Sequence, residues 1–208
     1  MTPEALVRAG TRWAAVPFVP EIRLLTAAEP FGLWDHSQRE DPPFWAFPWA
    51  GGQALARYVL DHPGTVHGRR VLDVASGSGL VAIAAAKAGA TSVIAGDVDP
   101  NAAAAIAINA RANDAAAVTA RVFDMAADDA SPAEVVLVAD VFYQRELAGL
   151  ALRFLRHAAG HGADVLVADP GRAFLPAADL SPLTSYQVPV LSVLEDTTVK
   201  TVTVYSLA

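Results

Sequence analysis

Five aspartates stand at or just after the ends of short apolar runs, and they are the first candidates for chemistry in this chain. They are Asp73, Asp97, Asp124, Asp140 and Asp169. In an open sheet of parallel strands, ligands bind beyond the carboxyl ends of the strands. A carboxylate at that edge accepts hydrogen bonds from hydroxyl and ammonium groups. The pattern therefore predicts one ligand site built from several strand ends.

A glycine turn follows the first of these runs, in VLDVASGSG (71–79). Its continuation satisfies the dinucleotide pattern G-x-G-x-x-A, and Asp97 follows about 20 residues later, as that pattern requires. Asp73 argues against a dinucleotide, because a carboxylate beside the turn suits an ammonium group and is a poor neighbour for a pyrophosphate. S-adenosylmethionine carries an ammonium group and no phosphate. The turn therefore favours a methyl-donor site, and an NAD-dependent oxidoreductase is the distant alternative.

The stretch DVASGSG (73–79) resembles motif I of the class I S-adenosylmethionine-dependent methyltransferases, D/E-x-G-x-G-x-G. Ala75 stands where that motif has its first glycine. We predict a negative φ at Ala75, because alanine resists the left-handed region. The segment 96–113 is similar to the second motif of the ribosomal-protein and protein-lysine branches. Its matching residues are Asp97, Asp99, Asn109 and Asn113.

The resemblance, which covers residues 41–175, implies roles in donor binding for the matching positions. Asp73 lies near the amino-acid end of the donor. Asp97 holds the ribose hydroxyls, and Asp99 is a weaker second partner. Asp124 and Met125 lie beside the adenine. The turn residues that let the backbone approach the donor are Ala75, Ser76, Gly77 and Gly79.

Three further motifs indicate what is methylated. DVFY (140–143) looks like the D-x-x-Y/F signature of the seven-strand protein lysine methyltransferases of family 16. PFWAFPWAGGQALARYVLD (43–61) and ADPGR (168–172) resemble the branch that acts on the beta subunit of electron transfer flavoprotein. Together they imply N-methylation of a lysine on that protein partner. A ribosomal-protein or small-molecule N-methyltransferase stays open as an alternative, because it would share the donor site.

The expected reaction is an in-line displacement at the sulfonium methyl, for which the protein supplies orientation and proximity. The acceptor amine must be neutral, yet a lysine with a pKa of about 10.4 is mostly protonated at neutral pH. Burial and the positive sulfonium both favour loss of that proton. We interpret Asp140 as an acceptor that orients the amine, with water taking the proton. Tyr143 is expected to shape the lysine channel.

Two tryptophans and the ADPGR motif supply the remaining candidates. In the family pattern a tryptophan before the first helix contacts the donor, and Trp49 matches it best. Trp45 is assigned to the substrate side; either ring can instead be a core aromatic beneath the proline-rich loop. Asp169 and Arg172 are also assigned to the substrate. Arg172 either meets an acidic group or forms a plain surface salt bridge.

These residues need a scaffold that brings the strand ends together. Apolar runs predict strands at 71–75, 92–97, 118–123, 134–140 and 163–169, and helical spacing predicts helices at 53–62, 80–89, 100–113 and 145–159. This alternation indicates a parallel sheet covered on both faces. Runs 184–193 and 197–207 flank the turn-like LED (194–196) and predict a hairpin at the sheet edge. The fold class is α/β: a Rossmann-like, doubly wound seven-stranded sheet of five parallel strands plus a C-terminal antiparallel hairpin, with helices on both faces.

We expect a single methyltransferase domain over residues 1–208. Residues 1–50 contain several prolines, which interrupt helices and strands, and are read as an irregular N-terminal lead-in. Residues 70–170 form the cofactor-binding core, and 184–207 form the terminal hairpin.

Composition narrows the choice of partners. A net charge of −7 argues against nucleic acid, which requires a basic face. The chain has no cysteine, so a thiolate metal site is excluded, and no histidine spacing predicts a metal. No apolar run is long enough for a membrane span. We recognise no targeting peptide and expect a cytoplasmic protein.

Overall fold

The computed structural model describes residues 1–28, 43–130, 132–195 and 197–207. Residues 29–42 of the predicted lead-in, residue 131 and Asp196 of the LED turn therefore lie outside the described residues. None of the helices within the described ranges is long and apolar enough to cross a membrane.

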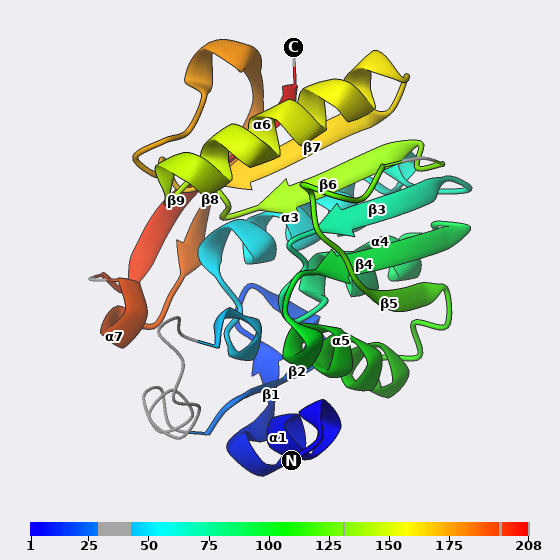
Figure 1. The fold of residues 1–208 in the computed structure, drawn as a ribbon. Helices are drawn as coiled ribbons and strands as arrows, with labels where there is room; N and C mark the ends of the chain where they lie inside the picture. Colours follow the sequence, from blue (N-terminus) through cyan, green and yellow to red (C-terminus); the bar gives the residue numbers. More distant parts are fainter. Residues whose placement is uncertain (29–42, 131, 196, 208) are drawn as a thin grey trace.

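A seven-stranded sheet organises the chain (Figure 1). Its strands are β3 (Arg70–Val74), β4 (Ser92–Asp97), β5 (Val118–Val122), β6 (Val135–Ala139), β7 (Asp164–Asp169), β8 (Leu180–Pro189) and β9 (Val199–Leu207). Their order across the sheet is β5-β4-β3-β6-β7-β9-β8. The first five are parallel, and β9 pairs antiparallel with both β7 and β8. The predicted fold class is confirmed.

The strand order creates a switch point between β3 and β6, which lie side by side in register. From β3 the chain moves to β4 on one side, and from β6 it moves to β7 on the other. The loops that leave the two central strands therefore diverge at their carboxyl ends, which is the place where open α/β sheets bind ligands. Asp73 lies within β3 and Asp140 directly follows β6, so the two lie on either side of this point.

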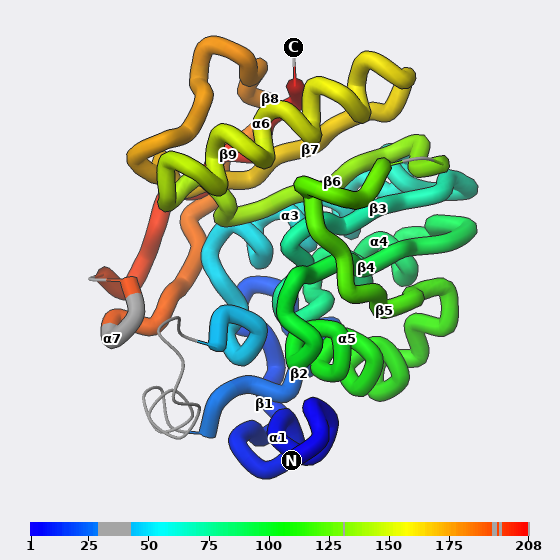
Figure 2. The backbone as a smooth tube through the Cα atoms, in the orientation of Figure 1, coloured from blue at the N-terminus to red at the C-terminus, as the bar shows by residue number. Residues whose placement is uncertain are grey.

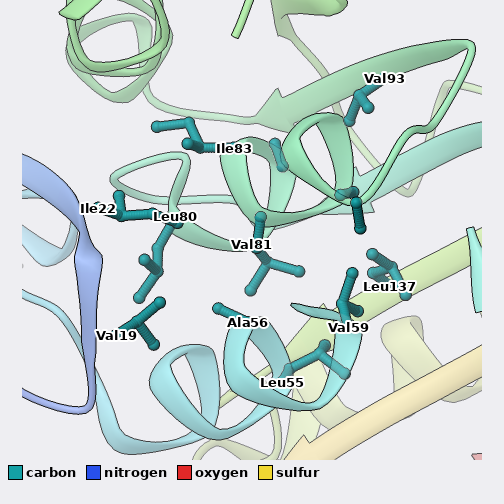
Figure 3. Close-up of a cluster of buried hydrophobic side chains, with 14 of the residues drawn as sticks. Val19, Ile22, Leu55, Ala56, Val59, Leu80, Val81, Ile83, Val93 and Leu137 are labelled. Atoms are coloured by element: carbon teal, nitrogen blue, oxygen red, sulfur yellow. The ribbon is translucent and has the colours of Figure 1, made fainter. Parts of the chain in front are cut away.

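Helices cover both faces of the sheet. They are α3 (Ala50–Asp61), α4 (Leu80–Lys87), α5 (Pro100–Ala112) and α6 (Arg145–Gly160). Along β6, Val135 and Leu137 face a core cluster with α3 and α4, while Val136 and Val138 face a second cluster with α6. Figure 3 shows the first cluster, where side chains of α3 and α4 meet the sheet. Because both faces are buried, the central strands are continuously apolar, which made them predictable.

Residues 3–27 lie in a helix and two strands joined by a short turn, so the predicted irregular lead-in is wrong there. They form α1 (Pro3–Gly10) and a two-stranded antiparallel sheet of β1 (Thr11–Val16) and β2 (Val19–Ala27). Pro17 falls in the tight turn between the strands, beside a register shift, so it breaks no ladder hydrogen bond. Figure 2 follows this N-terminal unit to its place beside α5, which α1 and β2 both contact.

The C-terminal hairpin differs from the prediction at its start and at its tip. β8 begins at Leu180 rather than 184, because a bulge next to Pro182 lets the strand continue past the proline. The tip contains a helical turn, α7 (Ser192–Glu195), where a simple LED turn was expected. This turn buries Glu195 against the main body, where it joins the candidate site.

Candidate active site

The glycine turn after β3 is fixed by hydrogen bonds to β4 and α5. The Ser76 amide donates to the carbonyl of Gly96 (3.0 Å), and the Gly77 amide donates to Oδ2 of Asp97 (2.9 Å). The carbonyl of Ser78 accepts from Nδ2 of Asn109 (2.8 Å). Gly77 has a φ of +54°, where a side chain would be strained. The turn is therefore a rigid bend with one face at the switch point.

Ala75 has a φ of +52°, so the predicted negative φ is wrong. The left-handed region costs a residue with a Cβ roughly 1–2 kcal/mol, so an ordinary backbone conformation is not the reason that alanine is accepted at this position. It is tolerated because the hydrogen bond of the next residue, Ser76, to Gly96 fixes the bend. Its methyl group also packs against the core cluster on the α6 face. The surrounding structure thus outweighs a local strain.

Asp73 is buried beneath the turn, with 2% of its surface exposed. Its Oδ2 accepts from Oγ of Ser76 (2.5 Å) and from the amide of Ala82 at the start of α4 (3.0 Å). Burial raises its pKa to about 7, and the nearby Asp97 charge adds to this, while the two hydrogen bonds oppose it. The carboxyl group therefore ties the turn to α4 and sits on the donor's predicted amino-acid side.

Replacing Asp73 by Asn tests this burial through the pH dependence of stability. A folded-state pKa above the ordinary 3.8 means that the native state holds its proton more tightly than the unfolded chain does. Stability is then fully present below about pH 4 and is lost as the pH rises through about 7. Between pH 5 and pH 8 the free energy of unfolding of the wild type should fall by about 2 kcal/mol through this group, and Asp73→Asn should not show this fall. Urea unfolding at several pH values measures the difference. The exposed Asp124→Asn is the control, and curves for Asp73→Asn that parallel the wild type would contradict the assignment.

Asp97 ends β4 and faces the turn. Its Oδ1 accepts from the amide of Asp99 (3.0 Å), and burial raises its pKa. Asp99 instead caps α5, because its Oδ1 accepts from the amide of Asn101 (2.9 Å). Val98, between the two acids, is 64% exposed and offers apolar surface beside Asp97. Sequence reasoning missed Val98, although an apolar residue between two strand-end acids was a readable signal.

Asp124 and Met125 follow β5, the neighbour of β4. The Phe123 amide donates to the carbonyl of Asp97 (2.9 Å), which holds this segment against the end of β4. Asp124 is exposed, and Met125 is half-buried against the core. The structure thus brings both residues to the edge where Asp97 and Val98 lie.

The polar side chains in and around the glycine turn suit a methyl donor that carries an ammonium group and hydroxyl groups. These side chains are the carboxyl groups of Asp73 and Asp97, the hydroxyl of Ser76 and the amide of Asn109. A buried acid, Asp73, and a half-buried acid, Asp97, would oppose the charge of a pyrophosphate, and desolvation raises the pKa of both. The ammonium and ribose hydroxyls of S-adenosylmethionine are hydrogen-bond donors, so the residues present fit that molecule.

Asp140 lies across the switch point from this turn, in a φ of +56°. Its Oδ2 accepts from the amide of Gly52 (3.1 Å), and its Oδ1 is 3.3 Å from Nη2 of Arg172. Burial raises the pKa of Asp140 to about 6, with Arg172 opposing this shift. Gly51 lies against the same carboxyl group: a Cβ there would be 2.5 Å from Oδ2. Contacts from α3 and from Arg172 therefore hold a strained, mostly buried carboxylate in one orientation.

Arg172 belongs to a mostly buried ionic cluster and not to a plain surface salt bridge. Its Nη2 also contacts Oε1 of Glu195 (3.1 Å), whose Oε2 contacts Nζ of Lys200 (2.7 Å). Asp169 fixes the turn that brings Arg172 to this cluster, because its Oδ1 accepts hydrogen bonds from the amides of Gly171 (2.7 Å) and Arg172 (2.6 Å). Sequence reasoning missed Glu195 and Lys200, since no local pattern relates the hairpin tip to residue 172.

Two side-chain atoms of the cluster are buried and have no hydrogen-bond partner in the described part of the chain. They are Oδ2 of Asp169, an acceptor, and Nε of Arg172, a donor. Burial raises the pKa of Asp169. An unsatisfied buried acceptor is costly, and it suits a ligand that brings a donor.

Aromatic rings connect the two halves of the site. The short helical turn η1 (Phe44–Ala46) precedes α3, and Trp49 donates from Nε1 to the carbonyl of Phe44 (2.9 Å). The Phe44 ring is 6.0 Å from the Trp49 ring and 5.6 Å from the Tyr143 ring. Trp45 is 2% exposed and packs in a core cluster with α5. This position agrees with the alternative that Trp45 is a core aromatic residue. Tyr143, in the segment that follows β6, is 36% exposed.

The profile of the ribosomal protein L11 methyltransferase (PrmA) family matches residues 54–162. A relative from Xenopus laevis, electron transfer flavoprotein beta subunit lysine methyltransferase, is 35% identical over 175 residues, 82% of this chain and 71% of the relative. Its Danio rerio counterpart is 39% identical over 162 residues, 74% of this chain and 61% of the relative.

Among solved structures, magnesium protoporphyrin IX methyltransferase from Synechocystis with bound S-adenosylmethionine has a TM-score of 0.56. It is 16% identical, over 76% of this chain and 79% of that chain, a likeness that concerns the fold alone.

The fold and the donor half of the site define a class I S-adenosylmethionine-dependent methyltransferase. Within that class, the chain belongs to the family of electron transfer flavoprotein beta subunit lysine methyltransferases.

Proposed function

We propose that this protein transfers a methyl group from S-adenosylmethionine to a lysine of the electron transfer flavoprotein beta subunit. The observation that carries the proposal is the carboxylate of Asp140, whose side chain is only 11% exposed and which lies across the switch point from the donor turn. The family relationship supports the class of acceptor. The cytoplasmic location expected from the sequence stays a prediction.

We assign the donor's binding groups to the β3–β4 side. S-adenosylmethionine, when bound, supplies a methyl group made electrophilic by its sulfonium. Asp73 and the turn meet its amino-acid end, and Asp97 accepts from the ribose hydroxyls. Val98, Asp124 and Met125 lie beside the base.

We assign the acceptor side to the β6–β7 half. Above its pKa of about 6, Asp140 is ionised and accepts a hydrogen bond from the lysine amine. It is a weak base toward an ammonium with a pKa of about 10.4, so the amine loses its proton to bulk solvent in an equilibrium before methyl transfer, which burial and the sulfonium favour. Asp140 then orients the lone pair of the neutral amine toward the methyl group. Arg172 holds the carboxylate in place, and the free Oδ2 of Asp169 is a second acceptor for the amine.

The test is methylation of purified partners with labelled donor. We expect label in the electron transfer flavoprotein beta subunit, on a lysine located by mass spectrometry, and at least about a 100-fold loss of rate in Asp140→Asn. Ribosomal protein L11 and small amines serve as the competing acceptors. Label that enters L11 or only small amines would overturn the assigned partner. A fully active Asp140→Asn would overturn the role of Asp140.

A further inference from the structure

Asn109 joins three parts of the molecule through one buried side chain. It lies on α5 with 0% of its surface exposed. Its Oδ1 accepts from the amide of Leu25 in β2 (2.9 Å), and its Nδ2 donates to the carbonyl of Ser78 in the glycine turn (2.8 Å). The side chain therefore transmits the position of the N-terminal unit to the donor turn.

Asn113, one helical turn later, bonds the same strand but not the glycine turn. Its Oδ1 accepts from the amide of Arg23 (3.1 Å), and its Nδ2 donates to the carbonyl of Arg23 (2.7 Å). It thus takes the place of a neighbouring strand along the outer edge of β2. The same Nδ2 also donates to the backbone carbonyl of Asn109 (2.8 Å). Asn109 lies within α5 and Asn113 is the residue that caps its C-terminal end; both are buried, and both bond to the same strand.

We propose that Asn109 is a positioning residue for the methyl donor, whereas Asn113 serves the docking of β2 alone. The proposal deepens the donor-site assignment and depends on donor binding at the turn after β3.

The conformation of the glycine turn depends on the hydrogen bond from Asn109 to the Ser78 carbonyl for two reasons. Ser78 is 5% exposed, so its carbonyl would lose its partner in a poorly hydrated place. The next residue, Gly79, has a φ of +83°, and a Cβ there would come within 3.2 Å of Ile106 of α5. Helix α5 thus supports the turn at two adjacent residues. Without the Asn109 amide group, the Ser78 carbonyl has lost its partner, and the peptide after Ser78 keeps only the bond from the Gly79 amide to the carbonyl of Ser76 (2.9 Å) among the bonds of the described chain. We therefore expect the turn to depart from the shape that the methyl donor requires.

The experiment compares Asn109→Asp with Asn113→Asp. Each change keeps side-chain size and one acceptor but removes the NH₂ donor. Affinity for S-adenosylhomocysteine is measured by calorimetry, and stability of the ligand-free proteins by urea unfolding. We expect both variants to lose stability, but only Asn109→Asp to bind the ligand about tenfold more weakly. In kinetics, KM for the donor should rise in Asn109→Asp while kcat changes little.

Equal weakening by both variants, or unchanged affinity in Asn109→Asp, would overturn the proposal. Wild-type protein that binds no S-adenosylhomocysteine would overturn the donor site itself, which separates the two failures. If Asn109→Asp does not fold, Asn109→Ala and Asn113→Ala are compared at low temperature with the same readouts and the same criteria.

Discussion

Replacing Gly51 by Ala should reduce kcat/KM for methyl transfer by at least about 100-fold, because the new methyl group displaces the carboxylate of Asp140. A Cβ at Gly51 would lie 2.5 Å from Oδ2 of Asp140 and 2.8 Å from the carbonyl of Ala168. That carbonyl belongs to β7 and accepts from the Asp140 amide, so the backbone cannot easily retreat. The side chain must then leave Gly52 and Arg172. We also expect a loss of roughly 1–3 kcal/mol of stability from overpacking.

Gly52→Ala is the matched control, one position further along α3. A Cβ there meets nothing within 4 Å, and the amide that donates to Asp140 is kept. Activity should therefore be unchanged, and stability should rise by up to about 1 kcal/mol because alanine favours the helix. Steady-state kinetics and urea unfolding of both variants give the comparison, and S-adenosylhomocysteine affinity should be the same in all three proteins. Wild-type activity in Gly51→Ala would show that the position of Asp140 is not needed.

Replacing Asp97 by Ala should weaken S-adenosylhomocysteine binding by about 100-fold or more. Two hydrogen bonds from ribose hydroxyls to a charged acceptor are lost, each worth roughly 1.5–3 kcal/mol. The glycine turn also loses the bond from the Gly77 amide to Oδ2 of Asp97. Calorimetry with S-adenosylhomocysteine measures the effect directly.

Asp99→Ala separates donor binding from helix capping. Asp99 caps α5 through Asn101, so its removal should cost about 1 kcal/mol of stability. As the weaker second partner of the ribose, it should change ligand affinity far less than Asp97 does. If Asp97→Ala binds the ligand as the wild type does, or if Asp99→Ala loses as much affinity, the ribose is held elsewhere. A parallel titration with NAD should give no heat of binding. Binding of NAD would instead support the alternative of an NAD-dependent oxidoreductase.

The parallel core could be predicted because its signals are local. Strands β3, β4, β6 and β7 are buried on both faces and read as continuous apolar runs, and the predicted ends fall within a residue of the observed ones. Asp97 and Asp169 end their strands, and Asp140 follows its strand directly. Parallel topology then brings those ends to one edge, so the candidate acids could be chosen before any coordinates.

The N-terminal unit could not be predicted, because what completes it is distant in sequence. The outer edge of β2 is satisfied by the side chains of Asn109 and Asn113, 84 and 90 residues from their partners. Read locally, the prolines of this region indicate only interruption. The asparagines matched a family motif, but the sequence alone gave no reason for their presence.

The sequence by itself determined the class of fold, the strand-end acids and the kind of donor that suits them, because strand patterning and a glycine turn beside an acid are properties of short segments. Only the tertiary structure decided how those acids are held. The positive φ of Ala75 follows from a bond between the turn and β4. The burial of Asp140 depends on Gly51, and the setting of Arg172 depends on Glu195 at the hairpin tip. Orientation and burial of a charge are fixed by neighbours from other elements, and these meet only when the chain has folded.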